Sequence, residues 1–165
     1  MSFGTHETLE VSERDGFVFV TLNRPKARNA MSLAMVHELL ALCTVLKEDD
    51  TRYRAVVIRG AEGHFCAGGD IKDMAQARAD AMSGQGDTDP YVALNRVFGE
   101  LITEVQALPQ VVVAVLEGAV LGGGFGLACV SDVAIATEDA KLGMPETTLG
   151  VVPAQIAPFV VQRIG

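Results

Sequence analysis

Two glycine-rich segments and one carboxylate are the residues whose types and spacing suggest chemistry in this chain. Residues 66–69 read Cys-Ala-Gly-Gly and precede Asp70, and a glycine triplet fills positions 122–124. Each segment follows an apolar run and precedes a stretch that can begin a helix. Free backbone N–H groups and the helix dipole favour negative charge at such a point, so donors from both segments could face one oxygen atom. Either cluster alone is more often a simple tight turn.

Other chemistries fit these residues poorly. No Walker lysine and hydroxyl follow the glycines, and no acidic residue closes a strand about 20 residues on, which disfavours nucleotide-phosphate chemistry. The three histidines lack metal-ligand spacing, so no metal site is predicted. Cys43, Cys66 and Cys129 lie in apolar or glycine-rich segments, which predicts buried, reduced thiols. Cys66 is expected to pack rather than to act as a nucleophile.

Composition narrows the class of protein. The 165 residues are 49% hydrophobic, in the size range of one domain, which we expect to span 1–165. The net charge of -8 argues against nucleic acid or an anionic membrane as a partner. The first residues lack a basic start and an apolar run, so a cytoplasmic protein is expected.

Apolar runs predict the strands. Residues 17–22 follow an Asp-Gly turn signal and are rich in β-branched and aromatic types. Three further runs are continuous enough to predict strands buried on both faces of a parallel sheet: residues 55–58, 111–116 and 133–136.

Helical spacing of apolar residues fills the gaps between strands. It predicts helices over 32–48 and 91–107, with Asn29 or Ser32 as the first N-cap, and the glycine triplet runs into the apolar segment 125–130. Residues 76–90 show no apolar period and are expected to form a loop, either a mobile lid or a plain solvated loop. The order βαβαβαβ predicts an α/β fold, either a superhelical stack or a flat doubly wound sheet.

Four segments, in order along the chain, resemble the motifs of the crotonase (enoyl-CoA hydratase/isomerase) family. They are residues 23–30 (NRPKARNA), 65–71 (FCAGGDI), 118–124 (GAVLGGG) and 142–146 (LGMPE). The resemblance covers essentially the whole chain and implies a crotonase-like ββα superhelix. Family members run on further into a C-terminal helical domain, so the resemblance implies that this domain is missing here. The resemblance therefore implies the N-terminal core of a longer subunit, expected to form a homotrimer or a dimer of trimers.

The resemblance also implies site residues. Backbone N–H groups of Gly69 and Gly123 would hold the thioester carbonyl of an acyl-CoA substrate, and Glu146 would be the catalytic carboxylate. Fixed donors stabilise the charge that develops on this oxygen when the α-carbon gains or loses a proton. Coenzyme A is part of the substrate, so no separate cofactor is expected. Its contacts are implied for Lys26, Ala27, Arg28, Ala67, Asp70, Ile71 and Lys72.

One position departs from the best-known hydratases of the family. They carry a second glutamate two residues after the glycine triplet, where this chain has Gly126. Glu146 must then serve both proton steps or be assisted by another group. A Δ3-Δ2 enoyl-CoA isomerase, which needs one carboxylate, is the alternative to a hydratase. A non-catalytic acyl-CoA-binding subunit is a third, favoured if Glu146 points away from the pocket.

Residues 149–165 indicate a subgroup within the family. They are similar to hydratases of branched glutaconyl-CoA substrates, such as 3-methylglutaconyl-CoA and isohexenylglutaconyl-CoA. This resemblance favours an enoyl-CoA hydratase, a lyase that acts in acyclic terpene or leucine breakdown. Arg163, Arg96 and Lys72 are candidates for binding the second substrate carboxylate, although each is more often a plain surface cation.

Overall fold

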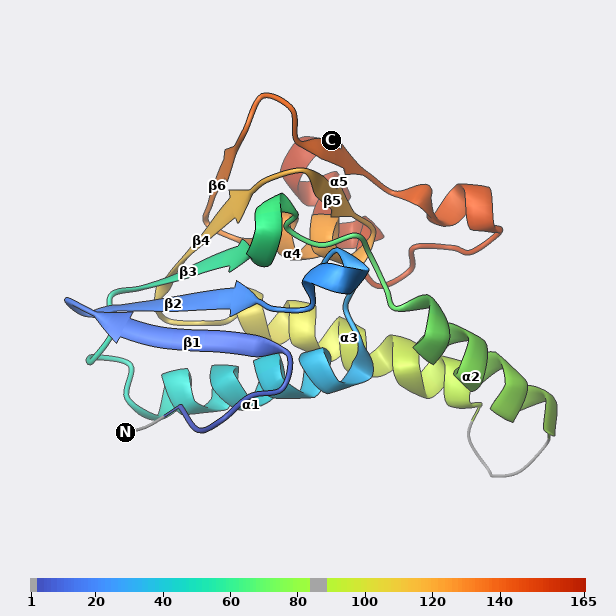
Figure 1. Ribbon diagram of the computed structural model, residues 1–165, viewed down its shortest axis with the longest axis horizontal. Coiled ribbons are helices and arrows are strands. Elements are labelled where there is room, and N and C mark those ends of the chain that lie inside the picture. The colour runs from blue at the N-terminus through green and yellow to red at the C-terminus, as the bar shows by residue number, and fades with distance from the viewer. Residues whose placement is uncertain (1–2, 84–88) are drawn as a thin grey trace.

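The computed structural model describes residues 3–83 and 89–165, which form a mixed sheet with helices packed against it (Figure 1). In the described residues the main sheet has the strand order β1-β2-β3-β4-β6, where β1–β2 is antiparallel and the other pairs are parallel. The strands are β1 (Leu9–Arg14), β2 (Phe17–Leu22), β3 (Ala55–Gly60), β4 (Val111–Leu116) and β6 (Val133–Ala136).

Strand β1 was not among the sequence predictions. Its apolar alternation is limited to Leu9 and Val11, and the strand is held by pairing with β2 along its whole length. The turn between them is formed by Asp15 and Gly16, both at positive φ (54° and 79°). Asp-Gly favours this conformation, whose twist matches that of a β-hairpin.

One face of the sheet forms the core. Val18, Val20 and Leu22 of β2 are fully buried, and the residues between them are only half-buried. Helices α1 (Leu33–Glu48) and α3 (Pro90–Gln106) lie along one side of this sheet (Figure 1).

The predicted burial on both faces is therefore wrong for β4 and β6, whereas in β3 the predicted residues 55–58 are all buried except the half-buried Val57. It fails most clearly at the edge strand β6, where Val133 is 44% and Ile135 57% exposed. The strand still pairs with β4, whose alternate residues Val112, Ala114 and Leu116 are buried. Apolar sequence on an edge strand thus does not imply burial of both faces.

Short strands build a second layer beside the main sheet. Strands β5 (Ala119–Leu121) and β7 (Lys141–Gly143) pair in parallel. Isolated bridges join Met31 to Gly69 and Cys66 to Val120. The chain thus repeats a strand–strand–helix unit, in β4-β5-α4 and again in β6-β7-α5, with α4 at Gly123–Val130 and α5 at Ala157–Ile164. This confirms the crotonase-like ββα superhelix over the flat doubly wound sheet.

Two helices lack the apolar period of an amphipathic helix, and each lacks it for a different reason. From Gly124 to its end α4 is buried all round, as expected for a central helix. Residues 76–83, predicted as loop, belong to helix α2 (Ile71–Ser83), whose only buried residue is Ala77, so no apolar period marks it. Of the rest of the predicted loop, residues 84–88 lie outside the described residues, and Asp89 caps α3, which begins at Pro90. None of the described helices is long and apolar enough to cross a membrane.

Candidate active site

The segment after β3 is fixed by hydrogen bonds on both sides. Cys66 N donates to Ala119 O (2.9 Å), and Cys66 O accepts from Leu121 N (2.9 Å). These bonds hold the first glycine-rich segment beside β5, which leads directly into the glycine triplet. The two glycine clusters, far apart in sequence, are therefore neighbours.

Gly69 is oriented by the bonds of its neighbours. Met31 N donates to Gly68 O (2.8 Å), and Met31 O accepts from Asp70 N (3.0 Å). In such a parallel bridge the central residue turns its own N–H away from the partner strand. Within the described part of the chain the Gly69 N–H has no acceptor, and Gly69 lines a pocket.

Gly123 offers a second free donor. It is the first residue of α4, and the first N–H groups of a helix have no intrahelical acceptor. No described residue accepts a hydrogen bond from it, and Gly123 lines the same pocket as Gly69. Gly122 makes the turn possible, because its φ of 50° and ψ of -120° suit only glycine.

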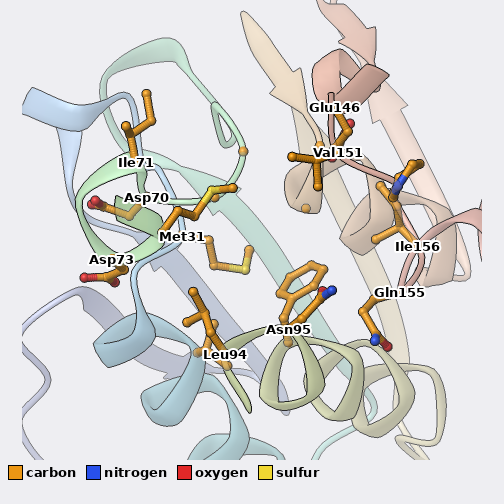
Figure 2. A pocket seen from close by; sticks show the side chains of 18 of the residues that line it. Met31, Asp70, Ile71, Asp73, Leu94, Asn95, Glu146, Val151, Gln155 and Ile156 are labelled. Carbon is orange, nitrogen blue, oxygen red and sulfur yellow. The ribbon is translucent and has the colours of Figure 1, made fainter. Parts of the chain in front are cut away.

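Glu146 lies against this turn, in the short 3₁₀ helix Pro145–Leu149. A methyl group on Gly122 would come within 2.7 Å of Glu146 Oε1, so the carboxylate occupies space that any side chain at 122 would fill. Glu146 Oε2 is buried, with no hydrogen-bond partner among the described residues. Figure 2 shows Glu146 and Val151 on the wall of the pocket opposite Asp70 and Ile71. The carboxylate is thus available to a bound molecule.

Six of the ten site residues predicted from sequence line this pocket: Ala67, Gly69, Asp70, Ile71, Gly123 and Glu146. The other four, Lys26, Ala27, Arg28 and Lys72, do not. Arg28 is nevertheless tied to the pocket wall, since its carbonyl accepts from Ala67 N (3.0 Å). Three of these four are exposed cations, Lys26, Arg28 and Lys72, available to an anionic group outside the pocket.

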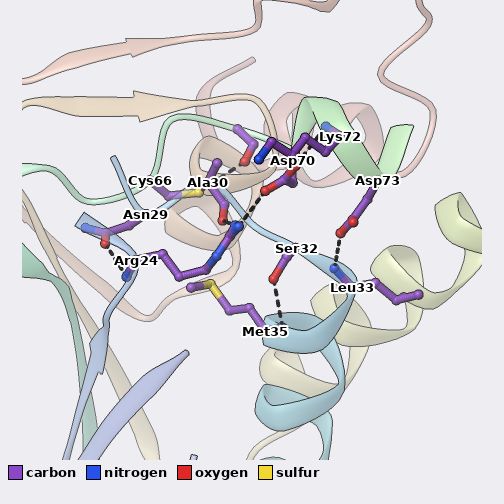
Figure 3. Close-up of polar contacts among 11 residues, drawn as sticks. Arg24, Asn29, Ala30, Ser32, Leu33, Met35, Cys66, Asp70, Lys72 and Asp73 are labelled. Carbon is purple, nitrogen blue, oxygen red and sulfur yellow. Dashed lines mark hydrogen bonds and ion pairs between the residues drawn. The ribbon is translucent and has the colours of Figure 1, made fainter. Parts of the chain in front are cut away.

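The Asp70 carboxylate is bound by other residues of the protein. Its Oδ2 pairs with Arg24 Nη2 at 2.7 Å, its Oδ1 accepts from Lys72 N (2.8 Å), and Arg24 also donates to Ala30 O (Figure 3). Burial acts to raise the pKa of Asp70, but the Arg24 guanidinium and the backbone N–H groups of Lys72 and Asp73 outweigh it. The pKa therefore lies below its ordinary value. The Arg24–Asp70 ion pair thus connects the segment before α1 to Asp70, the residue that follows Gly69.

Gly126, the position of the second hydratase glutamate, faces an isoleucine. A methyl group there would meet Ile156 Cγ2 at 2.3 Å and Ile156 Cβ at 3.0 Å. Ile156 is only 3% exposed and lines the pocket. The space beside Gly126 is thus already filled by a hydrocarbon side chain.

Cys66 fits the predicted packing role. Its side chain is completely buried, and burial raises the pKa of the thiol to about 11. At neutral pH it is therefore a neutral thiol, and the thiolate is the nucleophilic form.

Phe98, Asn95, Gln155 and Ile156 are among the pocket residues that were not predicted from sequence. Phe98 touches the glycine turn, since a methyl group on Gly123 would lie 2.8 Å from Phe98 Cζ. Asn95 of α3 and the pair Gln155 and Ile156 line the pocket as well (Figure 2). Asn95 interrupts the apolar face of a predicted helix, and this was the one signal that could have identified it.

The cations considered for a second substrate carboxylate do not line the pocket. Arg96 and Lys72 are exposed on α3 and α2. Arg163 is exposed and donates to Asp132 O (3.0 Å). Asp132 Oδ2 accepts from Val112 N (2.7 Å), so its side chain holds β4 beside the start of β6.

Comparison with known proteins agrees with this geometry. A family model described as enoyl-CoA hydratase/isomerase matches residues 17–164, nearly the whole chain. The chain belongs to the enoyl-CoA hydratase/isomerase family. Membership of this crotonase family explains the ββα repeats and the paired glycine turns together.

Individual relatives include solved structures. The chain is 62% identical to Pseudomonas aeruginosa AtuE, with a TM-score of 0.89 over 96% of this chain and 59% of that one. An enoyl-CoA hydratase/isomerase from Marinobacter aquaeolei is 60% identical, with a TM-score of 0.89 over 96% of this chain and 60% of that one. The 2,3-dehydroadipyl-CoA hydratase of Escherichia coli is 37% identical over 88% of this chain and 52% of its own length. The chain spans about half the length of the curated relatives it matches.

Proposed function

We propose that the protein is an enoyl-CoA hydratase, a lyase that adds water across the α,β double bond of an acyl-CoA thioester. The observation that carries the proposal is the meeting of two unpaired backbone donors and one unpaired carboxylate in a single pocket. Gly69 and Gly123 supply the N–H groups, and Glu146 supplies the carboxylate. This is the set of groups that an enolate reaction needs.

In the proposed mechanism the thioester oxygen accepts hydrogen bonds from the N–H groups of Gly69 and Gly123. Glu146 takes a proton from water while the water oxygen bonds to the β-carbon, and electrons move onto the thioester oxygen to form the enolate. The same carboxyl group then returns its proton to the α-carbon, and the carbonyl re-forms. The Ile156 side chain beside Gly126 supports a single carboxylate for both steps.

We propose a 3-branched glutaconyl-CoA as substrate, in acyclic terpene or leucine breakdown. Two observations support a substrate with a second carboxylate. Residues 149–165 resemble the hydratases of such substrates, and a relative at 37% identity is named for a dicarboxylic acyl-CoA. The coenzyme A part would be met by Lys26, Arg28 and Lys72, exposed cations in an acidic chain.

A Δ3-Δ2 enoyl-CoA isomerase is the second candidate, favoured by the lone carboxylate. One Glu146 that removes an α-proton and returns it to the γ-carbon is sufficient for that reaction. A non-catalytic acyl-CoA-binding subunit is less well supported, because Glu146 lines the pocket.

We also propose that the protein uses no separate cofactor, binds neither nucleic acid nor membrane, and acts in the cytoplasm. A homotrimer or a dimer of trimers is proposed as its assembly. Apolar side chains on the surface, including Val161 and Ile164 of α5, support contact with a further surface.

Mass spectrometry of the product tests the proposal, because hydration adds the mass of water and isomerisation leaves the mass unchanged. Glu146→Gln keeps the shape of the side chain but removes the base, and should lower kcat about 100- to 10,000-fold while acyl-CoA binding persists. Glu138→Gln, the same change at an exposed position outside the pocket, is the matched control. A Glu146→Gln protein within a few-fold of the parent rate would show that another group transfers the proton.

A further inference from the structure

Helix α3 presents two different rows of side chains to the pocket. Leu94 and Phe98, four residues apart, form an apolar row. Tyr91 and Asn95, also four residues apart, form a polar row, because residues at this spacing lie on one face of a helix. The next position in the polar row is Gly99, which has no side chain.

Gln155 fills that gap. A methyl group on Gly99 would come within 2.0 Å of Gln155 Oε1 and 2.8 Å of its Cδ, so the amide of Gln155 lies directly against α3. Figure 2 shows Asn95 and Gln155 beside α3 at the same side of the pocket. Because Gly99 has no side chain, the amide of Gln155, which comes from the segment before α5, takes the next place in the polar row of α3.

This row is free to bind a ligand. The side chains of Tyr91, Asn95 and Gln155 have no hydrogen-bond partner among the described residues, although all three line the pocket. Among the described residues that line the pocket none is Lys, Arg or His, so the neutral amides and the phenol of this row are the side-chain donors that these residues offer to a substrate anion. Amide donors can bind a carboxylate without a compensating charge.

The position of the row fits a particular chain length. Phe98 touches Gly123, one of the proposed oxyanion donors, and so marks the level of the thioester carbon. Asn95 lies three residues earlier, about 4.5 Å along the helix axis. An extended chain gains roughly 1.2 Å per bond, so the four bonds from C1 to C5 of an acyl group span about 4.7 Å. For an acyl chain that extends from Gly123 toward the N-terminal end of α3, a carboxylate at C5 would thus reach the level of Asn95, whereas Gln155, which lies against Gly99, is one turn nearer to the thioester.

We propose that Asn95, with Tyr91 and Gln155 one helical turn to either side of it, forms the subsite for the second carboxylate of a five-carbon dicarboxylic enoyl-CoA. The proposal rests on the proposed function and assigns the specificity of the same pocket to neutral donors on α3 rather than to a cation. Asn95 and Gln155 are then specificity-determining residues.

Two substrates isolate this role: glutaconyl-CoA and 2-pentenoyl-CoA, which has the same five carbons without the second acid. The readout is the ratio of their kcat/KM values. Asn95→Leu and Gln155→Met should each lower this ratio about 10- to 100-fold, the usual range for losing a hydrogen bond to a charged group. Asn95→Asp, which places a like charge at the subsite, should lower it further. Glu100→Gln, an exposed change on the same helix, is the control, and its ratio should equal that of the parent.

Three results would overturn the subsite: an unchanged ratio in the Asn95 and Gln155 variants, equal losses for both substrates, or a selective loss in Arg96→Gln, which would assign the carboxylate to the cation. Failure of the proposed function looks different, since the parent would hydrate neither substrate. Calorimetric binding of the two thioesters then decides the subsite separately. The parent should bind glutaconyl-CoA more tightly and Asn95→Asp should abolish that preference, whereas equal affinities in the parent would refute it.

Discussion

Replacing Gly126 by alanine should show how firmly Ile156 occupies the place of the second hydratase glutamate. The new methyl carbon would stand 2.3 Å from Ile156 Cγ2 and 3.7 Å from Ile102 Cδ1. Real carbon contacts lie near 3.5–4.0 Å, so a shift of more than about 1 Å is required. Ile156 is 3% exposed and Ile102 fully buried, so neither side chain can simply swing into solvent.

Two opposing effects set the magnitude. Overpacking a well-filled core costs about 1–3 kcal/mol. Alanine in place of glycine inside a helix returns roughly 1 kcal/mol, and Gly126 lies within α4. A contact as close as 2.3 Å calls for the upper part of the overpacking range, about 2–3 kcal/mol, so Gly126→Ala should be less stable by about 1–2 kcal/mol. In a chain of this length such a loss lowers Tm by about 2–8 °C. Urea unfolding followed by circular dichroism measures the free energy of unfolding directly.

Ile156→Ala makes the test specific. Alone it should cost about 2–5 kcal/mol, but it removes the Cγ2 atom that the new methyl group would meet. Adding Gly126→Ala to Ile156→Ala should then be neutral or stabilising, with a coupling free energy of about 1–3 kcal/mol between the two sites. A single variant as stable as the parent, or free energies that simply add, would refute the close contact.

Three other outcomes can be checked on the same protein. Gly123→Pro deletes the proposed oxyanion donor at a position where proline suits a helix start, and it should lower kcat about 100- to 1000-fold. Gly123→Ala makes the same contact with Phe98 but keeps the N–H group, so its kcat should fall much less. Equal losses of kcat in the two variants would contradict the assignment. Arg24→Gln should lower the unfolding free energy by about 1–2 kcal/mol at neutral pH. Because the pKa of Asp70 is lowered in the folded state, this difference should shrink as pH falls below about 4, measured by urea unfolding; a difference independent of pH would argue against the Arg24–Asp70 pair as its source. With a pKa of about 11, roughly 0.1% of Cys66 is thiolate at about pH 8, so iodoacetamide should label it more than about 100-fold more slowly in the folded than in the unfolded protein, and rapid native labelling would contradict its burial.

The sequence by itself determined the family and most of the secondary structure. Strands β2 and β4 and helices α1 and α3 follow from local runs and periods, which need only neighbouring residues. The family motifs likewise depend on local order, because a glycine that must approach a ligand or adopt a positive φ leaves a signature at its own position. Gly69, Gly123 and Glu146, which line the pocket, were therefore named as candidates before any fold was known.

Tertiary structure decided what depends on contacts between distant segments. Strand β1 has only two alternating apolar residues and helix α2 has no apolar period, so β1 depends on pairing with β2 and α2 on helix propensity rather than on a clear sequence pattern. Ile156 fills the space beside Gly126 although 30 positions separate them, and Gln155 lies on α3 because Gly99 leaves room. Close packing allows one occupant for each such space, and which residue fills it is fixed by how the elements cross rather than by local sequence.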